Sequence, residues 1–172
     1  IASRTVAKAE ALLEGHPQGH ALALMVEDDA ALEKQVAAHD LSISLLPYTH
    51  HVRVANLCLQ HRKPMVTTSY ISAPMRALDE RARQAGVLIL NEIGVDPGID
   101  HMSAMRVIHD VKARGGKVTA FSSYCGGLPA PEANTNPWGY KSSWSPRGVL
   151  MAGKNAGRFQ RDSPRGAVDG GR

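Results

Sequence analysis

Apolar and polar residues alternate in blocks along the first 96 positions. Short apolar runs predict strands, and the stretches between them, rich in Ala, Leu and Glu, predict helices of about 9–13 residues. The predicted strands are the end of one at residues 1–3, then Leu22–Val26, Leu41–Leu46, Met65–Thr68 and Val87–Asn91, and the predicted helices are Val6–Glu14, Ala31–His39, His51–Gln60 and Ala73–Ala85. This alternation is typical of βαβ units. We therefore expect an α/β fold with a doubly wound parallel sheet.

The pattern changes after residue 96. Apolar residues at helical spacing predict a helix over Asp100–Arg114, which Gly115 and Gly116 end. Lys117–Tyr124 is a predicted strand, and the Gly- and Pro-rich residues 126–147 predict a long functional loop. Residues 153–172 have little periodicity, so we expect them to be poorly ordered.

Composition narrows the class of function. The hydrophobic fraction of 43% and the charged fraction of 21% are those of a soluble globular protein. No apolar run approaches the roughly 18 residues of a membrane helix, and no signal peptide is visible. Cys58 and Cys125 are too few for a disulfide framework. These features predict a reduced, cytoplasmic setting and no membrane partner.

Charge and aromatic content bear on the ligand. The net charge is +4, with much of the excess after residue 153, and such a balance suits anionic small molecules. Aromatic residues are 5% of the chain and do not alternate with basic ones, so we expect no nucleic-acid partner. We also expect no metal site, because Pro17 and Gly19 argue against a helical pair of His16 and His20, and the adjacent His50 and His51 diverge.

Polar residues follow the ends of several predicted strands, where ligands bind in open α/β sheets. Ser3-Arg4-Thr5 ends the first strand, where a Rossmann domain that binds NAD carries a carboxylate and one that binds NADP can carry an arginine. No carboxylate is present, so Arg4 is a candidate for a 2′-phosphate contact. The alternative is a surface arginine beside the Thr5 helix cap. Thr68, Ser69 and Tyr70 suit polar recognition, or serve as a cap and a surface phenol.

Asp96 follows the last of these strands. It precedes Pro97-Gly98, so a turn former is one reading and an electrostatic group in a site is another. Asp100 and His101 are either proton donors or caps at a helix start.

Five segments together resemble the glutamate-forming saccharopine dehydrogenases, also called saccharopine reductases. The segments are Ser44–Tyr48, Val66–Tyr70, Asn91–His101, Ser123–Glu132 and Lys141–Ser145. The resemblance covers residues 1–152 and departs after about Arg158. It implies an NADP-linked oxidoreductase of lysine metabolism, which interconverts saccharopine with glutamate and 2-aminoadipate 6-semialdehyde, with small-molecule partners and a homodimeric assembly.

The resemblance also implies a layout. Residues 1–96 would be a partial Rossmann domain, 97–152 the start of an α/β substrate domain, and 153–172 a divergent tail. The Gly-rich phosphate loop, the first strand and the C-terminal part would lie outside this chain. The chain alone would then be inactive; a related imine or amino-acid dehydrogenase and a non-catalytic remnant remain open as alternatives.

The resemblance implies roles for individual residues. Ser69, Tyr70 and Asp96 would bind substrate, and Asp96 would act electrostatically in catalysis. Cys125 would lie near the active site without acting as a nucleophile, its alternative being a small buried residue. Trp144 would be a wall over NADP(H), or a core residue. The expected cofactor contacts are Ser3, Arg4, Thr5, Leu46, Thr68, Ser69, Val95, Asp96, Pro97 and Trp144.

Overall fold

The computed structural model describes residues 1–142, 146–152, 157–159 and 168–170, and the chain forms two compact units, Ile1–Ser123 and Tyr124–Arg172. The first unit contains the strands β1 (Ala2–Ser3), β2 (Leu22–Ala23), β3 (Ser42–Ser44), β4 (Met65–Thr67) and β5 (Ile89–Leu90). Its helices are α1 (Val6–Leu13), α2 (Asp29–Ala38), η1 (Tyr48–His50), α3 (His51–Gln60), α4 (Ala73–Arg76), α5 (Asp79–Ala85) and α6 (Ile99–Ala113).

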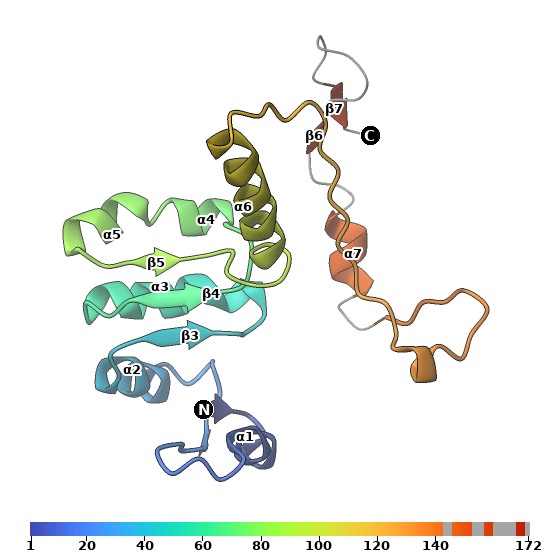
Figure 1. Ribbon diagram of the computed structural model, residues 1–172. Coiled ribbons are helices and arrows are strands. Elements are labelled where there is room, and N and C mark those ends of the chain that lie inside the picture. Colours follow the sequence, from blue (N-terminus) through green and yellow to red (C-terminus); the bar gives the residue numbers. More distant parts are fainter. Residues whose placement is uncertain (143–145, 153–156, 160–167, 171–172) are drawn as a thin grey trace. The chain divides into compact units, whose positions relative to one another are not determined.

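All strand pairs of this unit are parallel. β3, β4 and β5 lie side by side in one sheet, as Figure 1 shows, with Ile43 opposite Val66 and Val66 opposite Leu90. β1 and β2 form a separate pair. The expected α/β fold with parallel strands joined by helices is confirmed.

The core lies on one face of the three-stranded sheet. α3 packs against β3, β4 and the helices α2, α4 and α5. Buried residues of this core include Leu32, Val36, Val54, Ala55, Cys58, Leu59, Met65, Met75, Leu78 and Ala82. On the other face Ile43 is 64% exposed and Leu88 60%. In the described part of the chain, helices therefore cover one face of β3–β5, and an apolar face stays open.

β1 and β3 do not pair among the described residues. In the strand order 3-2-1-4-5-6 of a Rossmann sheet, one further strand separates the two elements that correspond to them. The gap between the β1–β2 pair and the β3–β5 sheet therefore lies at the position of the central strand of a Rossmann sheet.

The helix predicted over Ala73–Ala85 is wrong as a single element, because the chain forms α4 and α5. The Ser72 hydroxyl caps α4 by accepting from the Met75 N–H at 3.3 Å. The Leu78 N–H then bonds to the Met75 carbonyl three residues back, which tightens the turn. This bend places both Met75 and Leu78 in the core.

The strand predicted over Lys117–Tyr124 is also wrong, since these residues form no regular element. A strand needs a partner, and no described strand pairs with this segment. The helix before it is confirmed as α6, but none of its residues is buried; Met102 is 54% exposed and Met105 45%. The apolar stripe of α6 therefore has no cover in the described residues.

The second unit holds η2 (Pro131–Ala133), α7 (Pro146–Ala152) and an antiparallel pair, β6 (Gly157–Phe159) with β7 (Val168–Gly170). The loop predicted over 126–147 is broken by η2 and by the start of α7. β6 and β7 lie within residues 153–172, for which poor order stays a prediction, and residues 153–156, 160–167 and 171–172 lie outside the described structure. None of the described helices is long and apolar enough to cross a bilayer.

Candidate active site at the carboxyl ends of β4 and β5

Two loops meet where β4 and β5 end. The Glu92 N–H donates to the Ser69 carbonyl at 3.2 Å, and the Ile93 N–H donates to the Thr67 carbonyl at 3.3 Å. The Glu92 carboxylate accepts from the Ile71 N–H at 3.1 Å, so the Glu92 side chain also joins the two loops. These bonds fix the loop that carries Ser69 and Tyr70 against the loop that leads to Asp96.

The segment from Gly94 to Asp100 is a tight turn. The Gly94 N–H donates to the Pro97 carbonyl at 2.8 Å, and the Gly94 carbonyl accepts from the Ile99 N–H at 2.9 Å. Gly98 has φ +148°, and a Cβ there would lie 2.2 Å from the Gly94 oxygen. Only glycine fits this position, and the turn projects the exposed Asp96 from its tip.

Tyr70 and Asp96 come together across the two loops. The Tyr70 hydroxyl donates to Asp96 Oδ1 at 3.3 Å. Partial burial, and then the charge and hydrogen bond of Asp96, raise the pKa of Tyr70. The phenol is therefore a stable donor to the carboxylate at neutral pH, and both side chains remain exposed to a ligand.

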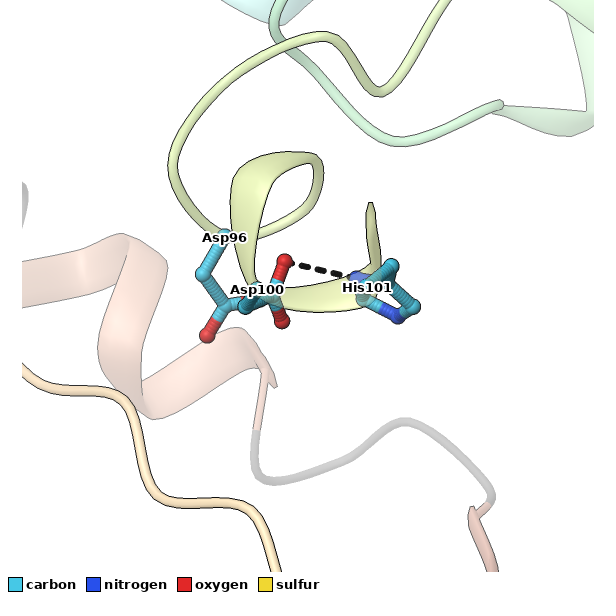
Figure 2. Close-up of side chains that lie close together, drawn as sticks. All are labelled: Asp96, Asp100 and His101. Carbon is cyan, nitrogen blue, oxygen red and sulfur yellow. Dashed lines mark hydrogen bonds and ion pairs between the residues drawn. The ribbon is translucent and has the colours of Figure 1, made fainter. Parts of the chain in front are cut away.

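Asp100 and His101 begin α6 beside Asp96 (Figure 2). Asp100 Oδ1 accepts from the Gly98 N–H at 2.9 Å and from His101 Nδ1 at 2.7 Å. Burial works to raise the pKa of Asp100, but these hydrogen bonds outweigh it and lower the pKa. The bond and charge of Asp100 raise the pKa of His101. Asp100 thus stabilises the turn before α6 through the Gly98 N–H, although Gly98 and not Asp100 or His101 is the N-cap residue of the helix.

Ser69 is held from behind by a buried histidine. His51 Nε2 lies 2.8 Å from Ser69 Oγ and 3.1 Å from Thr67 Oγ1, and Nδ1 lies 2.9 Å from Ser44 Oγ. Ser44, His51 and Thr67 are buried, whereas Ser69 is half-buried. Burial, and then the charge of His50, lower the pKa of His51.

The remaining predicted residues lie around this junction or at β1. Thr68 is exposed beside Gly94, whose Cβ position would lie 3.2 Å from the Thr68 Cβ. Leu46 packs against the core, Val95 is 66% exposed, and Pro97 is buried in the turn. Each of these four comes from a strand end of the β3–β5 sheet or from the loop behind it.

Ser3, Arg4 and Thr5 lie apart, at the end of β1. The Ser3 hydroxyl accepts from the Thr5 N–H at 3.2 Å. Thr5 is the N-cap residue of α1, as expected, but its side chain makes no cap hydrogen bond. Arg4 is exposed, and no described residue forms a hydrogen bond or ion pair with its guanidinium. A cation beside a hydroxyl that still has a proton to donate fits a phosphate group.

Two predicted residues belong to the second unit. Cys125 is exposed there, which contradicts the alternative of a small buried side chain. Trp144 lies outside the described residues. Neither residue is placed relative to Asp96.

Asp96, Asp100 and His101 offer ligand atoms within 4.8 Å of one another. This spacing could accommodate a cation. However, Asp96 Oδ1 and Asp100 Oδ1 already accept hydrogen bonds from Tyr70, Gly98 and His101. We therefore assign these groups to the protein's own bonding and propose no metal site.

Sequence reasoning missed the roles of His51 and Glu92. His51 could have been found, because His51, Val54, Ala55 and Cys58 follow the 0, 3, 4, 7 spacing of one helical face, and all four are buried. A histidine on the apolar face at a helix start beside strand ends indicates a polar network. Glu92 carries no comparable signal, since its contact depends on the fold of two loops.

Two family models cover nearly the whole chain. The "Saccharopine dehydrogenase NADP binding domain" matches residues 1–90, and the "Saccharopine dehydrogenase C-terminal domain" matches residues 94–172. The chain belongs to the saccharopine dehydrogenase family. Its first 90 residues match the family's NADP-binding domain. This range contains all five parallel strands and ends with β5, so the loop after β5 lies outside it.

Individual relatives agree with this family. The chain is 52% identical over 170 residues to saccharopine dehydrogenase (NADP(+), L-glutamate-forming) of Schizosaccharomyces pombe, covering 99% of this chain and 38% of the relative. It is 43% identical to alpha-aminoadipic semialdehyde synthase of Arabidopsis thaliana, covering 99% of this chain and 16% of the relative. The chain therefore spans well under half the length of these relatives.

A solved structure resembles the whole fold. The apo histidine-tagged saccharopine dehydrogenase (L-Glu forming) from Saccharomyces cerevisiae matches with a TM-score of 0.79 and 46% identity. The match covers 98% of this chain and 38% of that one. At this identity the likeness supports both the fold and the family.

Proposed function

We propose that residues 1–172 form part of an NADP-linked, glutamate-forming saccharopine dehydrogenase. The observation that carries the proposal is the 52% identity to the fission-yeast relative over 99% of this chain. In the proposed reaction, a hydride passes to the nicotinamide from the lysine-derived CH2 next to saccharopine's secondary amine, and the amine nitrogen releases its proton to solvent. Water then hydrolyses the resulting imine to glutamate and 2-aminoadipate 6-semialdehyde. The reverse direction condenses and reduces the same two compounds.

Asp96 is the proposed electrostatic group. Its exposed carboxylate stands at the carboxyl ends of the strands, where it can hold the substrate's ammonium or stabilise the developing iminium. The Tyr70 hydroxyl holds one oxygen of that carboxylate, and Ser69 presents a second hydroxyl on the same loop. Ser69 and Tyr70 are accordingly the proposed substrate contacts.

NADP(H) supplies the hydride acceptor or donor. Arg4, with Ser3 and Thr5, would bind the 2′-phosphate at the end of β1, since Arg4 is exposed and its guanidinium is not engaged by a described residue. The other proposed contacts border the strand ends, and these are Leu46, Thr68, Ser69, Val95, Asp96 and Pro97, with Trp144 as a wall and Cys125 near the site.

The architecture supports a larger enzyme around this chain. An apolar sheet face is open at Ile43 and Leu88, the β1 and β3 edges are unpaired, and the stripe of α6 is uncovered among the described residues. We propose that residues 1–96 are part of the Rossmann domain, that 97–152 begin the substrate domain, and that 153–172 are a divergent tail. We further propose that the whole enzyme is cytoplasmic and forms a homodimer. Light scattering would measure the molar mass of this homodimer.

A chimera tests this function. Residues 1–172 would replace the matching stretch of the S. pombe relative, and saccharopine-dependent reduction of NADP and of NAD would be measured for the chimera, for that relative and for the 172-residue chain alone. We expect turnover by the chimera, faster with NADP, and none by the chain alone. A folded chimera without saccharopine turnover would favour a related imine dehydrogenase or a non-catalytic remnant.

A further inference from the structure

His51 lies behind the candidate site and joins three hydroxyl groups. The residue is 3% exposed, and its ring contacts Ser44 of β3 through Nδ1 and both Thr67 and Ser69 through Nε2, across distances of 2.8–3.1 Å. These residues come from β3, α3, β4 and the loop after β4. The network therefore links the half-buried Ser69 to the rigid ends of two strands.

The two ring nitrogens have different surroundings. Nε2 faces two hydroxyl oxygens, and a nitrogen lone pair accepts one linear O–H bond, whereas an N–H can be shared between two oxygens. Nδ1 faces Ser44 Oγ alone, which can donate its proton to a lone pair. The geometry therefore favours a neutral ring with the proton on Nε2 and a lone pair on Nδ1.

This arrangement gives the Ser69 hydroxyl a direction. Because its oxygen accepts from Nε2–H in this tautomer, its own proton is left to be donated to another acceptor. The Ser69 carbonyl is meanwhile fixed by the Glu92 N–H. Both ends of Ser69 are thus held before any ligand binds, which is the preorganisation that binding sites need.

We propose that His51 is a positioning residue, which as a neutral imidazole orients the Ser69 hydroxyl to donate a hydrogen bond to an acceptor oxygen on the bound substrate or cofactor. The proposal deepens the proposed function and rests on it. His51 does not transfer a proton to substrate, because it is buried and both its nitrogens are engaged. The lowered pKa of His51 agrees with a neutral ring.

Two variants separate positioning from a merely structural role. In His51→Gln the side-chain amide can still donate to Ser69 from the Nε2 position, whereas in His51→Asn the shorter amide reaches only toward Ser44. We expect His51→Gln to keep kcat/KM within about threefold of the chimera, and His51→Asn to lose about tenfold, as Ser69→Ala does. His39→Gln, at an exposed histidine that follows α2 as its C-cap residue, is the matched control and should leave kcat/KM unchanged.

A double variant completes the test. If His51 acts through Ser69, adding His51→Asn to Ser69→Ala costs no further activity in the folded protein, because the group to be oriented is gone. Equal losses in His51→Gln and His51→Asn, or full additivity with Ser69→Ala, would overturn the proposal. Melting temperatures of all variants identify a loss that reflects unfolding alone.

A spectroscopic readout keeps this inference separate from the proposed function. Nitrogen-15 shifts of histidine in the chimera, assigned through His51→Gln, report which ring nitrogen holds the proton. We expect the Nε2–H form of His51 at neutral pH, even if the chimera lacks saccharopine turnover. An Nδ1–H or charged ring would refute the positioning network, whereas the Nε2–H form in an inactive chimera would refute only the substrate assignment.

Discussion

The Tyr70 hydroxyl donates a hydrogen bond to Asp96 Oδ1 at 3.3 Å, although 26 positions separate the two residues in sequence. The bond joins the loop after β4 to the turn after β5. Its donor is stable at neutral pH because burial and the Asp96 charge raise the pKa of Tyr70. The hydrogen bond therefore fixes the position of Asp96 Oδ1 and leaves the second carboxylate oxygen of Asp96 for a ligand.

Removing this bond should weaken the site without unfolding it. Tyr70→Phe keeps the ring and loses only the donor, so we expect kcat/KM of the chimera to fall about three- to tenfold, the range for a modest hydrogen bond. Tyr140→Phe, on a half-exposed tyrosine, is the control. An unchanged kcat/KM in Tyr70→Phe would show that the bond does not matter for turnover.

Gly98 should be intolerant of any side chain. Gly98→Ala would place a Cβ 2.2 Å from the Gly94 oxygen at φ +148°, and we expect the free energy of unfolding to fall by about 2–3 kcal/mol. Gly115→Ala has φ +76° but no atom within 4 Å of its Cβ, so it isolates the cost of the backbone conformation. Urea denaturation of the two variants should separate them, and equal losses would contradict the proposed clash.

His51 should make stability depend on pH. Its pKa in the folded state is lowered from 6.5, so the unfolded chain binds more protons between the two values. Stability should then fall as pH drops below about 6.5, with a slope of at most about 1.4 kcal/mol per pH unit. In His51→Gln this part of the pH dependence should disappear. If it persists, another group is responsible.

Arg4 should set the choice between NADP and NAD. Arg4→Ala removes the proposed contact with the 2′-phosphate, and we expect the preference for NADP to fall about tenfold or more, mainly through a higher KM for NADP. Lys8→Ala, an exposed cation one turn along α1, controls for general charge. An equal effect of both variants would indicate attraction by net charge rather than recognition by Arg4.

Local patterns predicted the first unit well. His51–Gln60 was predicted with the bounds of α3, because its apolar spacing, its length and the strands around it agree. The polar residues after β4 and β5 could be grouped from the rule that parallel strands end at one edge. The Tyr70–Asp96 contact fits that expectation.

Other features depend on contacts that a sequence pattern does not contain. Lys117–Tyr124 has a strand-like composition, but a strand exists only where a partner pairs with it. The break between α4 and α5 follows from burying both Met75 and Leu78. The roles of Glu92 and of the His51 network depend on how two loops and three elements meet.

The most direct test of the account is the rate of saccharopine-dependent NADPH formation by the chimera with Asp or Asn at position 96. Asp96→Asn keeps the size of the side chain and removes its charge, so we expect kcat to fall about a hundredfold while the melting temperature stays the same. Asp110→Asn, an exposed carboxylate on α6, should keep full activity. A folded Asp96→Asn chimera with the activity of its parent would contradict the electrostatic role of Asp96 and the site built around it.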